Sequence, residues 1–215
     1  IRTPVNSVLG LIEMANRAKG DKEKLWEYQR KALSSLEYLL SIINNILDMG
    51  KVESGKIELD STPFDLTELF TQNLPIVEMQ ANDCDVKCIS EIRVQHTHLI
   101  GSPVHLNRIL MNLTTNAIKY NRLGGTVTMR CVETPLDSTH ALFHFTCADT
   151  GCGISREFQP HLFEPFSQEG KNSITTFSSS GLGLSIVREI IYAHGQNINV
   201  VSTEGVGTEF IFTLD

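Results

Sequence analysis

A heptad pattern of leucine and isoleucine between residues 33 and 47 restricts what the N-terminal part of this chain can form. The apolar residues follow one another by three, four, three and four positions, and they are Leu33, Leu36, Leu40, Ile43 and Leu47. This spacing places them in one stripe along an α-helix, as in coiled coils. Leu39, Ile42 and Ile46 widen the stripe. We therefore expect the helix to bury this face against other helices.

A shorter amphipathic pattern precedes the heptads, and its apolar residues are Val5, Val8, Ile12 and Ala15. The polar run Lys19-Gly20-Asp21 predicts a turn between two helices, and Ser54-Gly55 predicts the end of the second. The two helices of a single hairpin cannot by themselves bury both of these wide apolar stripes. We expect a homodimer in which two hairpins form a four-helix bundle. The alternative is a hairpin packed on the globular domain of its own chain.

The polar run Ser61-Thr62-Pro63-Phe64-Asp65 indicates a domain boundary. The helical hairpin then comprises residues 1–60, and a second domain comprises residues 62–215. Helices are expected in that domain at residues 66–80, 103–120 and 180–194, and strands at 86–92, 125–132, 141–148, 198–202 and 208–214. The fold class expected for the whole chain is α+β, with an α/β sandwich of one sheet against a helix layer after the hairpin.

Composition excludes several classes of protein. The chain has 18 Lys and Arg against 25 Asp and Glu, and this net charge of -7 argues against a nucleic-acid partner. No apolar run approaches the roughly 20 residues that span a bilayer. Five cysteines without a CxxC pair fit reduced thiols and a cytoplasmic location. A zinc site is conceivable but disfavoured, because its four ligands match no standard spacing: Cys84, Cys88, His96 and His98.

Three groups of residues in the second domain suggest a ligand site. Asn112, Asn116 and Lys119 share one helix face, where amide oxygens suit Mg²⁺; an exposed polar face is the alternative. The run Asp149-Thr150-Gly151-Cys152-Gly153-Ile154 follows a strand, and its glycines allow a close approach of backbone to ligand unless it is an ordinary turn. The run Ser180-Gly181-Leu182-Gly183-Leu184 opens a helix whose N-terminus attracts phosphate.

In this order, after a heptad hairpin, the motifs resemble the cytoplasmic core of a sensor histidine kinase. The first six residues, Ile1-Arg2-Thr3-Pro4-Val5-Asn6, are similar to the end of that family's H box. Residues 112–120 are similar to its N box, residues 163–166 to its F box, and residues 149–154 and 180–184 to its two glycine boxes. The resemblance extends over essentially the whole chain.

The resemblance implies a dimerisation and histidine-phosphotransfer hairpin followed by an ATP-binding domain of the Bergerat type. The activity implied is that of a protein-histidine kinase, which uses ATP to phosphorylate a histidine and passes the group to an aspartate of a response-regulator receiver domain. The acceptor histidine would precede Ile1, so the fragment as given is expected not to autophosphorylate. Any membrane attachment is expected to lie outside this fragment.

The resemblance also implies roles for individual residues. Asn116 would coordinate Mg²⁺ beside Asn112, and Lys119 would meet the phosphates. Asp149 would bind the adenine amino group. Thr3 would help to orient a water molecule when a phosphorylated partner is dephosphorylated. The other residues expected around ATP are Tyr120, Gly151, Gly153, Ile154, Phe166, Ser180, Gly181, Leu182, Gly183, Leu184 and Thr208.

The chain departs from the family pattern in two places. Ser102 and His105 replace a usual acid and base, so an ion pair is expected to be lost. In the expected ATP lid, residues 167–180, a phosphate-facing charge and two glycines are replaced by Thr176, Ser178 and Ser179. These changes leave open a degenerate or phosphatase-biased nucleotide-binding dimer with little kinase activity. A chaperone-like or topoisomerase-like ATPase is a third possibility, which the hairpin disfavours.

Overall fold

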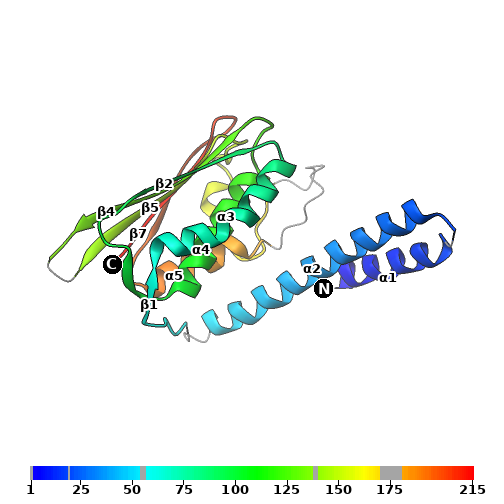
Figure 1. The fold of residues 1–215 in the computed structure, drawn as a ribbon, viewed down its shortest axis with the longest axis horizontal. Coiled ribbons are helices and arrows are strands. Elements are labelled where there is room, and N and C mark those ends of the chain that lie inside the picture. Colours follow the sequence, from blue (N-terminus) through cyan, green and yellow to red (C-terminus); the bar gives the residue numbers. More distant parts are fainter. Residues whose placement is uncertain (1, 19, 54–56, 138–139, 170–180) are drawn as a thin grey trace.

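The computed structural model describes residues 2–18, 20–53, 57–137, 140–169 and 181–215 of the 215-residue chain. A helical hairpin is followed by a sandwich of helices against one sheet, which confirms the α+β class (Figure 1). The hairpin consists of α1 (Arg2–Arg17) and α2 (Lys22–Glu53). The other elements are β1 (Thr62–Asp65), α3 (Leu66–Asp83), β2 (Lys87–Arg93), β3 (His98–Gly101), α4 (Pro103–Lys119), β4 (Thr126–Pro135), β5 (Ala141–Asp149), the 3₁₀ helix η1 (Gln159–His161), α5 (Gly183–Ala193), β6 (Ile198–Thr203) and β7 (Gly207–Leu214).

The turn between α1 and α2 is short because backbone hydrogen bonds close it. The Asp21 N–H donates to the Ala18 carbonyl oxygen, and Asp21 Oδ1 accepts from the Lys24 N–H at 3.2 Å. A helix N-terminus leaves unpaired N–H groups, so Asp21 caps α2. The residues proposed for the end of α2, Ser54 and Gly55, lie outside the described residues.

The heptad stripe of α2 stays open to water in the single chain. Leu33 and Leu40 are 61% and 58% exposed, and Leu36 and Ile43 are also exposed. Between the two helices, Val8 and Ala32 are buried. Although α2 also contacts α5, this contact leaves the stripe uncovered. None of the helices that the structure describes combines the length and the hydropathy needed to span a bilayer.

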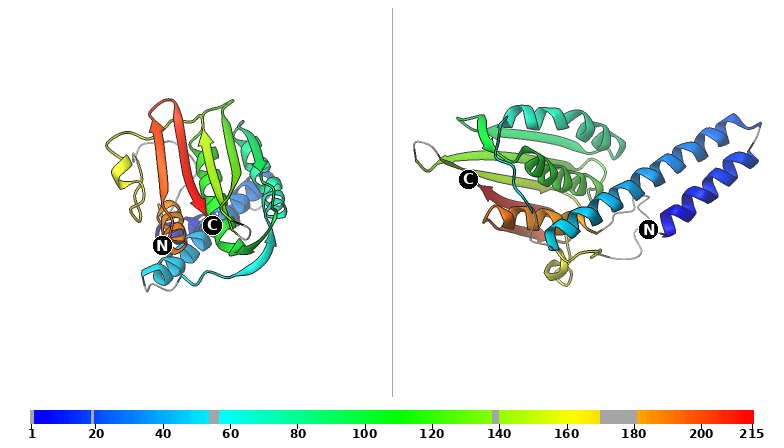
Figure 2. Two further views of the ribbon diagram at one scale, coloured as in Figure 1. Left: turned by 90° about the vertical axis from the view of Figure 1, so that its left-hand side faces the viewer. Right: turned by 90° about the horizontal axis from the view of Figure 1, so that it is seen from below.

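The second domain has one main sheet with strand order β2-β4-β5-β7-β6. The β2–β4 pair is parallel and the other three pairs are antiparallel. Figure 2 shows that α3, α4 and α5 cover the same face of this sheet. Because successive side chains of a strand point to opposite faces, alternate residues enter the core. In β5 and β7 these include Phe145 and Phe212, whose rings stack with centroids 4.9 Å apart.

A second, two-stranded sheet was not expected from the sequence. β1 pairs antiparallel with β3, with Thr62 opposite Gly101 and Asp65 opposite His98. The polar run that indicated a domain boundary therefore contains a strand. The Asp65 side chain then accepts a hydrogen bond from the Glu68 N–H at 2.9 Å, which caps α3.

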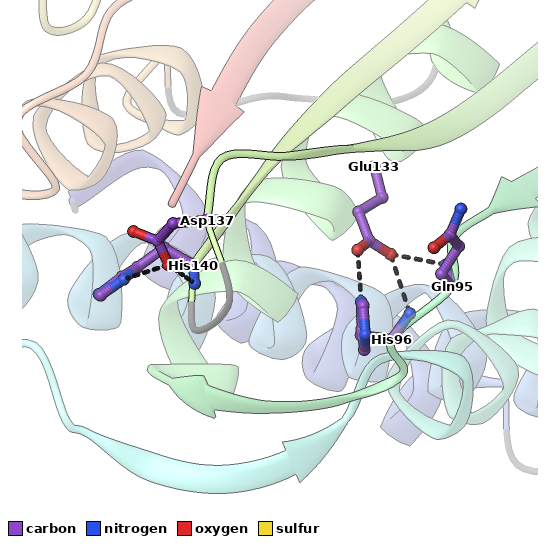
Figure 3. Close-up of polar contacts among 5 residues, drawn as sticks. All are labelled: Gln95, His96, Glu133, Asp137 and His140. Carbon is purple, nitrogen blue, oxygen red and sulfur yellow. Dashed lines mark hydrogen bonds and ion pairs between the residues drawn. The ribbon is translucent and has the colours of Figure 1, made fainter.

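Glu133, near the end of β4, fastens the connection between β2 and β3 (Figure 3). Its Oε2 accepts hydrogen bonds from the Gln95 N–H at 2.6 Å and the His96 N–H at 2.9 Å. Its Oε1 lies 2.6 Å from His96 Nδ1. The hydrogen bond with the His96 ring is the main cause that lowers the pKa of the Glu133 carboxyl; burial opposes it, and the two backbone donors add to the lowering. Figure 3 also shows His140, whose N–H donates to Asp137 Oδ1.

Candidate nucleotide site

One flank of α4 meets the beginning of α5. The Asn112 side-chain amide donates to the Arg108 carbonyl oxygen at 2.9 Å, which fixes the direction of the side chain. Its Oδ1 would lie 2.6 Å from a Cβ atom built on Gly183, so a side chain at residue 183 would displace the amide. This contact explains why α5 begins with glycine at that point. Asn116 follows Asn112 by about one helical turn on the same flank, where it is half-buried.

The end of α4 supplies Lys119 and Tyr120. Lys119 Nζ lies 5.1 Å from the centroid of the Tyr120 ring, and this ring is part of a side chain that is 41% exposed. The Tyr120 carbonyl oxygen accepts a hydrogen bond from the Cys152 N–H at 3.0 Å. The N-box helix is thus joined directly to the loop that follows β5.

Asp149 is the last residue of β5 and pairs with Thr208, the second residue of β7. Its Oδ1 accepts hydrogen bonds from the Gly151 N–H at 2.8 Å and from the Thr208 N–H at 3.2 Å. Burial raises the pKa of the Asp149 carboxyl, and the two backbone donors oppose that rise. Because two backbone N–H groups hold Oδ1, the direction of Oδ2 is also fixed.

The glycines around Asp149 are required by close backbone contacts. A Cβ atom on Gly151 would overlap the Tyr120 carbonyl oxygen, and one on Gly153 would overlap the Thr203 carbonyl oxygen. Gly153 also has a positive φ of 67°, which L-residues adopt at a cost. Gly207 approaches Asp149 in the same way, with its backbone against the Asp149 carbonyl. Three segments of chain therefore interlock at this point.

Ser202 and Gln159 support this loop, and sequence reasoning missed both. Ser202 Oγ accepts from the Ile154 N–H at 2.9 Å and lies 2.9 Å from Thr208 Oγ1. Gln159 Nε2 donates to the Ile154 carbonyl oxygen at 3.1 Å. Their partners are distant in sequence or belong to an irregular segment, so no local spacing marks either residue.

The F-box segment and the second glycine box meet at Phe166 and Gly181. The Phe166 N–H donates to the Gly181 carbonyl oxygen at 2.9 Å. Both residues have positive φ, 63° for Phe166 and 70° for Gly181. Leu182 is fully buried and Leu184 is half-buried. Ser180 and the altered residues Thr176, Ser178 and Ser179 lie outside the described residues.

Two family patterns match this chain. Residues 101–215 match the family described as "Histidine kinase-, DNA gyrase B-, and HSP90-like ATPase". Residues 1–55 match the "His Kinase A (phospho-acceptor) domain". The chain belongs to the histidine kinase family. Its second domain is accordingly an ATP-binding domain of this family, preceded by a phospho-acceptor hairpin.

Curated relatives agree with this assignment. The chain is 36% identical over 215 residues to "Sensor protein GacS" of Pseudomonas syringae pv. syringae. It is 32% identical over 214 residues to "Circadian input-output histidine kinase CikA" of Synechococcus elongatus. All or nearly all of the chain is aligned in both cases, but it spans only 24% and 28% of the length of these two relatives.

Solved structures share the fold of this kinase core. Full-length ShkA in complex with AMPPNP aligns over 99% of the chain and 43% of its own length, with 26% identity and a TM-score of 0.72. The Acinetobacter baumannii histidine kinase AdeS aligns over 100% of the chain and 95% of its own length. Its TM-score is 0.73 at 20% identity, so it supports the fold alone.

The structure brings most residues expected around the nucleotide into one region of the kinase core. Asn112 lies against Gly183, Tyr120 against Gly151, and Asp149 against Thr208. Thr3 is separate from them, in α1 of the hairpin.

The structure also shows the surroundings of Ser102 and His105 and of the four residues considered for zinc. Ser102 Oγ lies 2.7 Å from His105 Nδ1, so a hydrogen bond joins the positions where an ion pair was expected to be lost. The four residues of the zinc alternative do not assemble: His96 pairs with Glu133, and His98 lies 3.5 Å from Asp65. In the ranges that the structure describes, no three His, Cys, Asp or Glu residues gather in a metal-ligand arrangement.

Proposed function

We propose that this chain is the catalytic core of a sensor histidine kinase that binds ATP between α4, the loop after β5 and the start of α5. The observation that carries the proposal is the convergence at Asp149, where two backbone donors fix a half-buried carboxylate beside three closely packed glycines. Such a site presents one directed acceptor, and the packing of the three glycines against backbone carbonyl oxygens holds it in place. A directed acceptor of this kind suits the amino group of a purine.

Asp149 is the residue proposed to recognise the base. Its Oδ2 accepts no hydrogen bond from the described part of the chain, whereas Oδ1 accepts two. An exocyclic amino group of adenine is a donor of matching chemistry. Thr208 is proposed to assist, since it already lies beside the carboxylate and its hydroxyl is held by Ser202. Tyr120, Gly151, Gly153 and Ile154 would form the neighbouring walls.

The phosphates are proposed to lie toward α4 and the N-terminus of α5. The α5 helix begins at Gly183 without a side-chain cap, and the partial positive charge of a helix N-terminus favours anions. Lys119 adds a cationic group at the end of α4. The amide oxygens of Asn116 and Asn112 are ligands of the kind that Mg²⁺ accepts. When bound, Mg²⁺ would neutralise charge on the phosphates.

The proposed reaction transfers the γ-phosphoryl group of ATP to an imidazole nitrogen of the histidine before Ile1. An N–P bond forms, the bond between Pγ and the bridging oxygen breaks, and ADP leaves with the electron pair. Phosphoryl transfer depends mainly on positioning and charge stabilisation. In a second step, an aspartate of a receiver domain would take the phosphoryl group from the histidine.

A homodimer and a response-regulator receiver domain are the proposed partners. The exposed leucine stripe of α2 supports the first, because a second hairpin would cover it. The receiver domain is proposed from the histidine kinase ThkA, whose structure is described as a complex with response regulator protein TrrA. The alternative of a kinase with little activity depends on Thr176, Ser178 and Ser179, and it gains no support from the described residues.

Asp149→Asn tests the proposed recognition of adenine. The amide keeps the shape of the side chain but presents a donor where an acceptor is needed. We expect about 100-fold weaker ATP binding by calorimetry, because mismatched hydrogen bonds to a charged group cost roughly 1.5–3 kcal/mol. Glu204→Gln, an exposed acid near the same loops, serves as the control and should bind normally. Wild-type affinity in Asp149→Asn, with an unchanged melting temperature, would remove Asp149 from the site.

A further inference from the structure

The helix layer does not fully cover the edge strand β2. In the parallel pairing of β2 with β4, Cys88 lies opposite Val127 and Ser90 lies opposite Met129. Val127 and Met129 are buried beneath the helices, so Cys88 and Ser90 also face the helix layer. Nevertheless Cys88 is only half-buried and Ser90 is exposed. An inward-facing position that remains exposed indicates an opening between α3 and the sheet.

That opening leads into a cleft of about 70 Å³ between α3, α4, β2 and β4. Figure 2 shows α3 and α4 side by side over this part of the sheet. The walls of the cleft are mainly apolar and include Phe70, Leu74, Val77, Leu110, Met111 and Met129. The one ionisable carboxylate among the lining residues is Glu78, which is exposed at the mouth.

We propose that this cleft is a second ligand site, separate from the nucleotide site, for a small neutral molecule with a branched alkyl group. The walls exclude a charged ligand, because burying an unpaired charge costs many kcal/mol. The volume is about half of the roughly 150 Å³ cavity that takes benzene, so a group of about four carbon atoms fits. A polar end of the ligand would leave through the mouth beside Ser90 and Glu78.

The amide of Asn73 supports this choice of ligand. Its Nδ2 already donates to the Leu69 carbonyl oxygen at 2.9 Å and to Asn107 Oδ1. The most buried polar side chain of α3 at the cleft is thus engaged within the protein. The interior therefore selects for apolar groups rather than for hydrogen bonding.

The α4 helix connects the cleft with the proposed nucleotide site. Met111 and Thr114 line the cleft, while Asn112 faces Gly183 and is followed by Asn116 on the same flank. At roughly 100° per residue, these two pairs lie on opposite flanks of the helix. A ligand that moves α4 would change the position of Asn112, and binding at either site would then affect the other reciprocally. This link, unlike the cleft itself, depends on the proposed function.

The site is tested on the full 215-residue chain without nucleotide, with xenon as the probe. Xenon enters empty apolar cavities. The chain has five methionines, so methyl NMR reports on the cleft through Met111 and Met129 and on other surfaces through Met14 and Met79. We expect saturable shifts at Met111 and Met129 only. Absence of these shifts would overturn the proposal whether or not the chain binds ATP.

Two variants that fill the cleft make the test specific. Ser90→Phe and Cys88→Leu add volume at inward-facing positions of β2, and both should abolish the xenon shifts. Ser90→Thr adds little volume and should keep them. Equal shifts in the wild type and in a folded Ser90→Phe variant would place xenon elsewhere and overturn the proposal.

The link through α4 is tested with 2-methylpropan-1-ol, which carries a branched alkyl group. Saturating amounts should change the dissociation constant of ATP by about fivefold in the wild type and leave it unchanged in Ser90→Phe. An unchanged ATP affinity in the wild type, together with clear shifts at Met111, would overturn the link. Failure of ATP binding altogether would instead contradict the proposed function.

Discussion

The two domains of this chain treat their apolar residues in opposite ways. The ATP-binding domain buries Phe145 and Phe212 of its sheet and Ile109 of α4 almost completely. The hairpin leaves Leu33 and Leu40 more than half exposed along a continuous stripe. Burial of apolar area is the main favourable contribution to folding. The comparison indicates that the ATP-binding domain contains its own core, whereas the hairpin leaves an apolar stripe that the proposed second chain would cover.

The largest effect is expected from Phe212→Ala in the sheet. Its ring stacks on Phe145 and is 1% exposed, so truncation leaves a cavity that costs about 3–5 kcal/mol of unfolding free energy. Urea unfolding followed by circular dichroism measures this loss. Val201→Ala, at a position that is 60% exposed on β6, is the control and should change stability by less than about 0.5 kcal/mol. Similar losses for both variants would refute an independent core.

Leu36→Glu tests the other half of the comparison. A glutamate at an exposed position of the single hairpin is tolerated, but two of them facing each other in a dimer repel. We expect self-association to weaken about 100-fold, as measured by analytical ultracentrifugation, with unchanged ATP binding. Leu123→Glu changes an 81% exposed residue of the ATP-binding domain in the same way and should leave association intact. A stable Leu36→Glu dimer would mean that the stripe is not the interface.

Glu133→Gln is expected to have a smaller effect on the ATP-binding domain. It weakens charge-assisted hydrogen bonds to Gln95 and His96, at a cost of about 1–2 kcal/mol. The pKa of Glu133 is lower in the folded state than in the unfolded state. Its contribution to the free energy of unfolding is therefore complete above the ordinary pKa of a glutamate, and it is lost as the pH falls through the pKa of the folded state. The difference between wild type and variant should therefore shrink below about pH 4.5.

The pH dependence is measured by thermal unfolding between pH 3 and pH 7. Glu91→Gln is the matched control, since Glu91 makes an ion pair with Arg130 on the open face of the sheet. Such pairs contribute only about 0–1 kcal/mol. A difference between wild type and Glu133→Gln that persists at acid pH would show that the carboxylate charge is not responsible.

The smallest effect, with the opposite sign, is expected from Gly10→Ala in α1. A Cβ atom at this residue would meet nothing within 4 Å in the single chain. Alanine favours a helix over glycine by about 1 kcal/mol, so the hairpin should gain up to that amount. Thermal unfolding measures the gain. A loss of stability and of self-association would instead show that a second chain packs closely against Gly10.

Features with a local pattern could be predicted from the sequence. The heptads of α2 and the glycines at residues 151, 153, 181 and 183 are recognisable because their spacing reflects the helix period or a tight backbone contact. Their presence predicted the α+β fold and the family. The assignment of individual residues to ATP and Mg²⁺ stays a prediction that the proposed experiments address.

Features that depend on pairing between distant segments could not be predicted. The strand at Thr62–Asp65 pairs with a partner at His98–Gly101, and its own four residues, which include Pro63, show no alternation of apolar and polar residues. Ser202 is similar, because its hydroxyl joins Ile154 and Thr208 only after three segments come together. The hydrophobic period of a segment predicts that it is a strand, but it does not identify the strand with which it pairs.

The cysteines of the sheet have a practical consequence. Burial raises the pKa of the Cys131 thiol to about 12 and also raises that of Cys147, so neither forms a thiolate at neutral pH. Since only the thiolate reacts with alkylating reagents, both are protected for as long as the sheet stays closed. Cys152, in the loop after β5, is exposed. The rate of alkylation at these residues would separate opening of the loop from opening of the whole sheet.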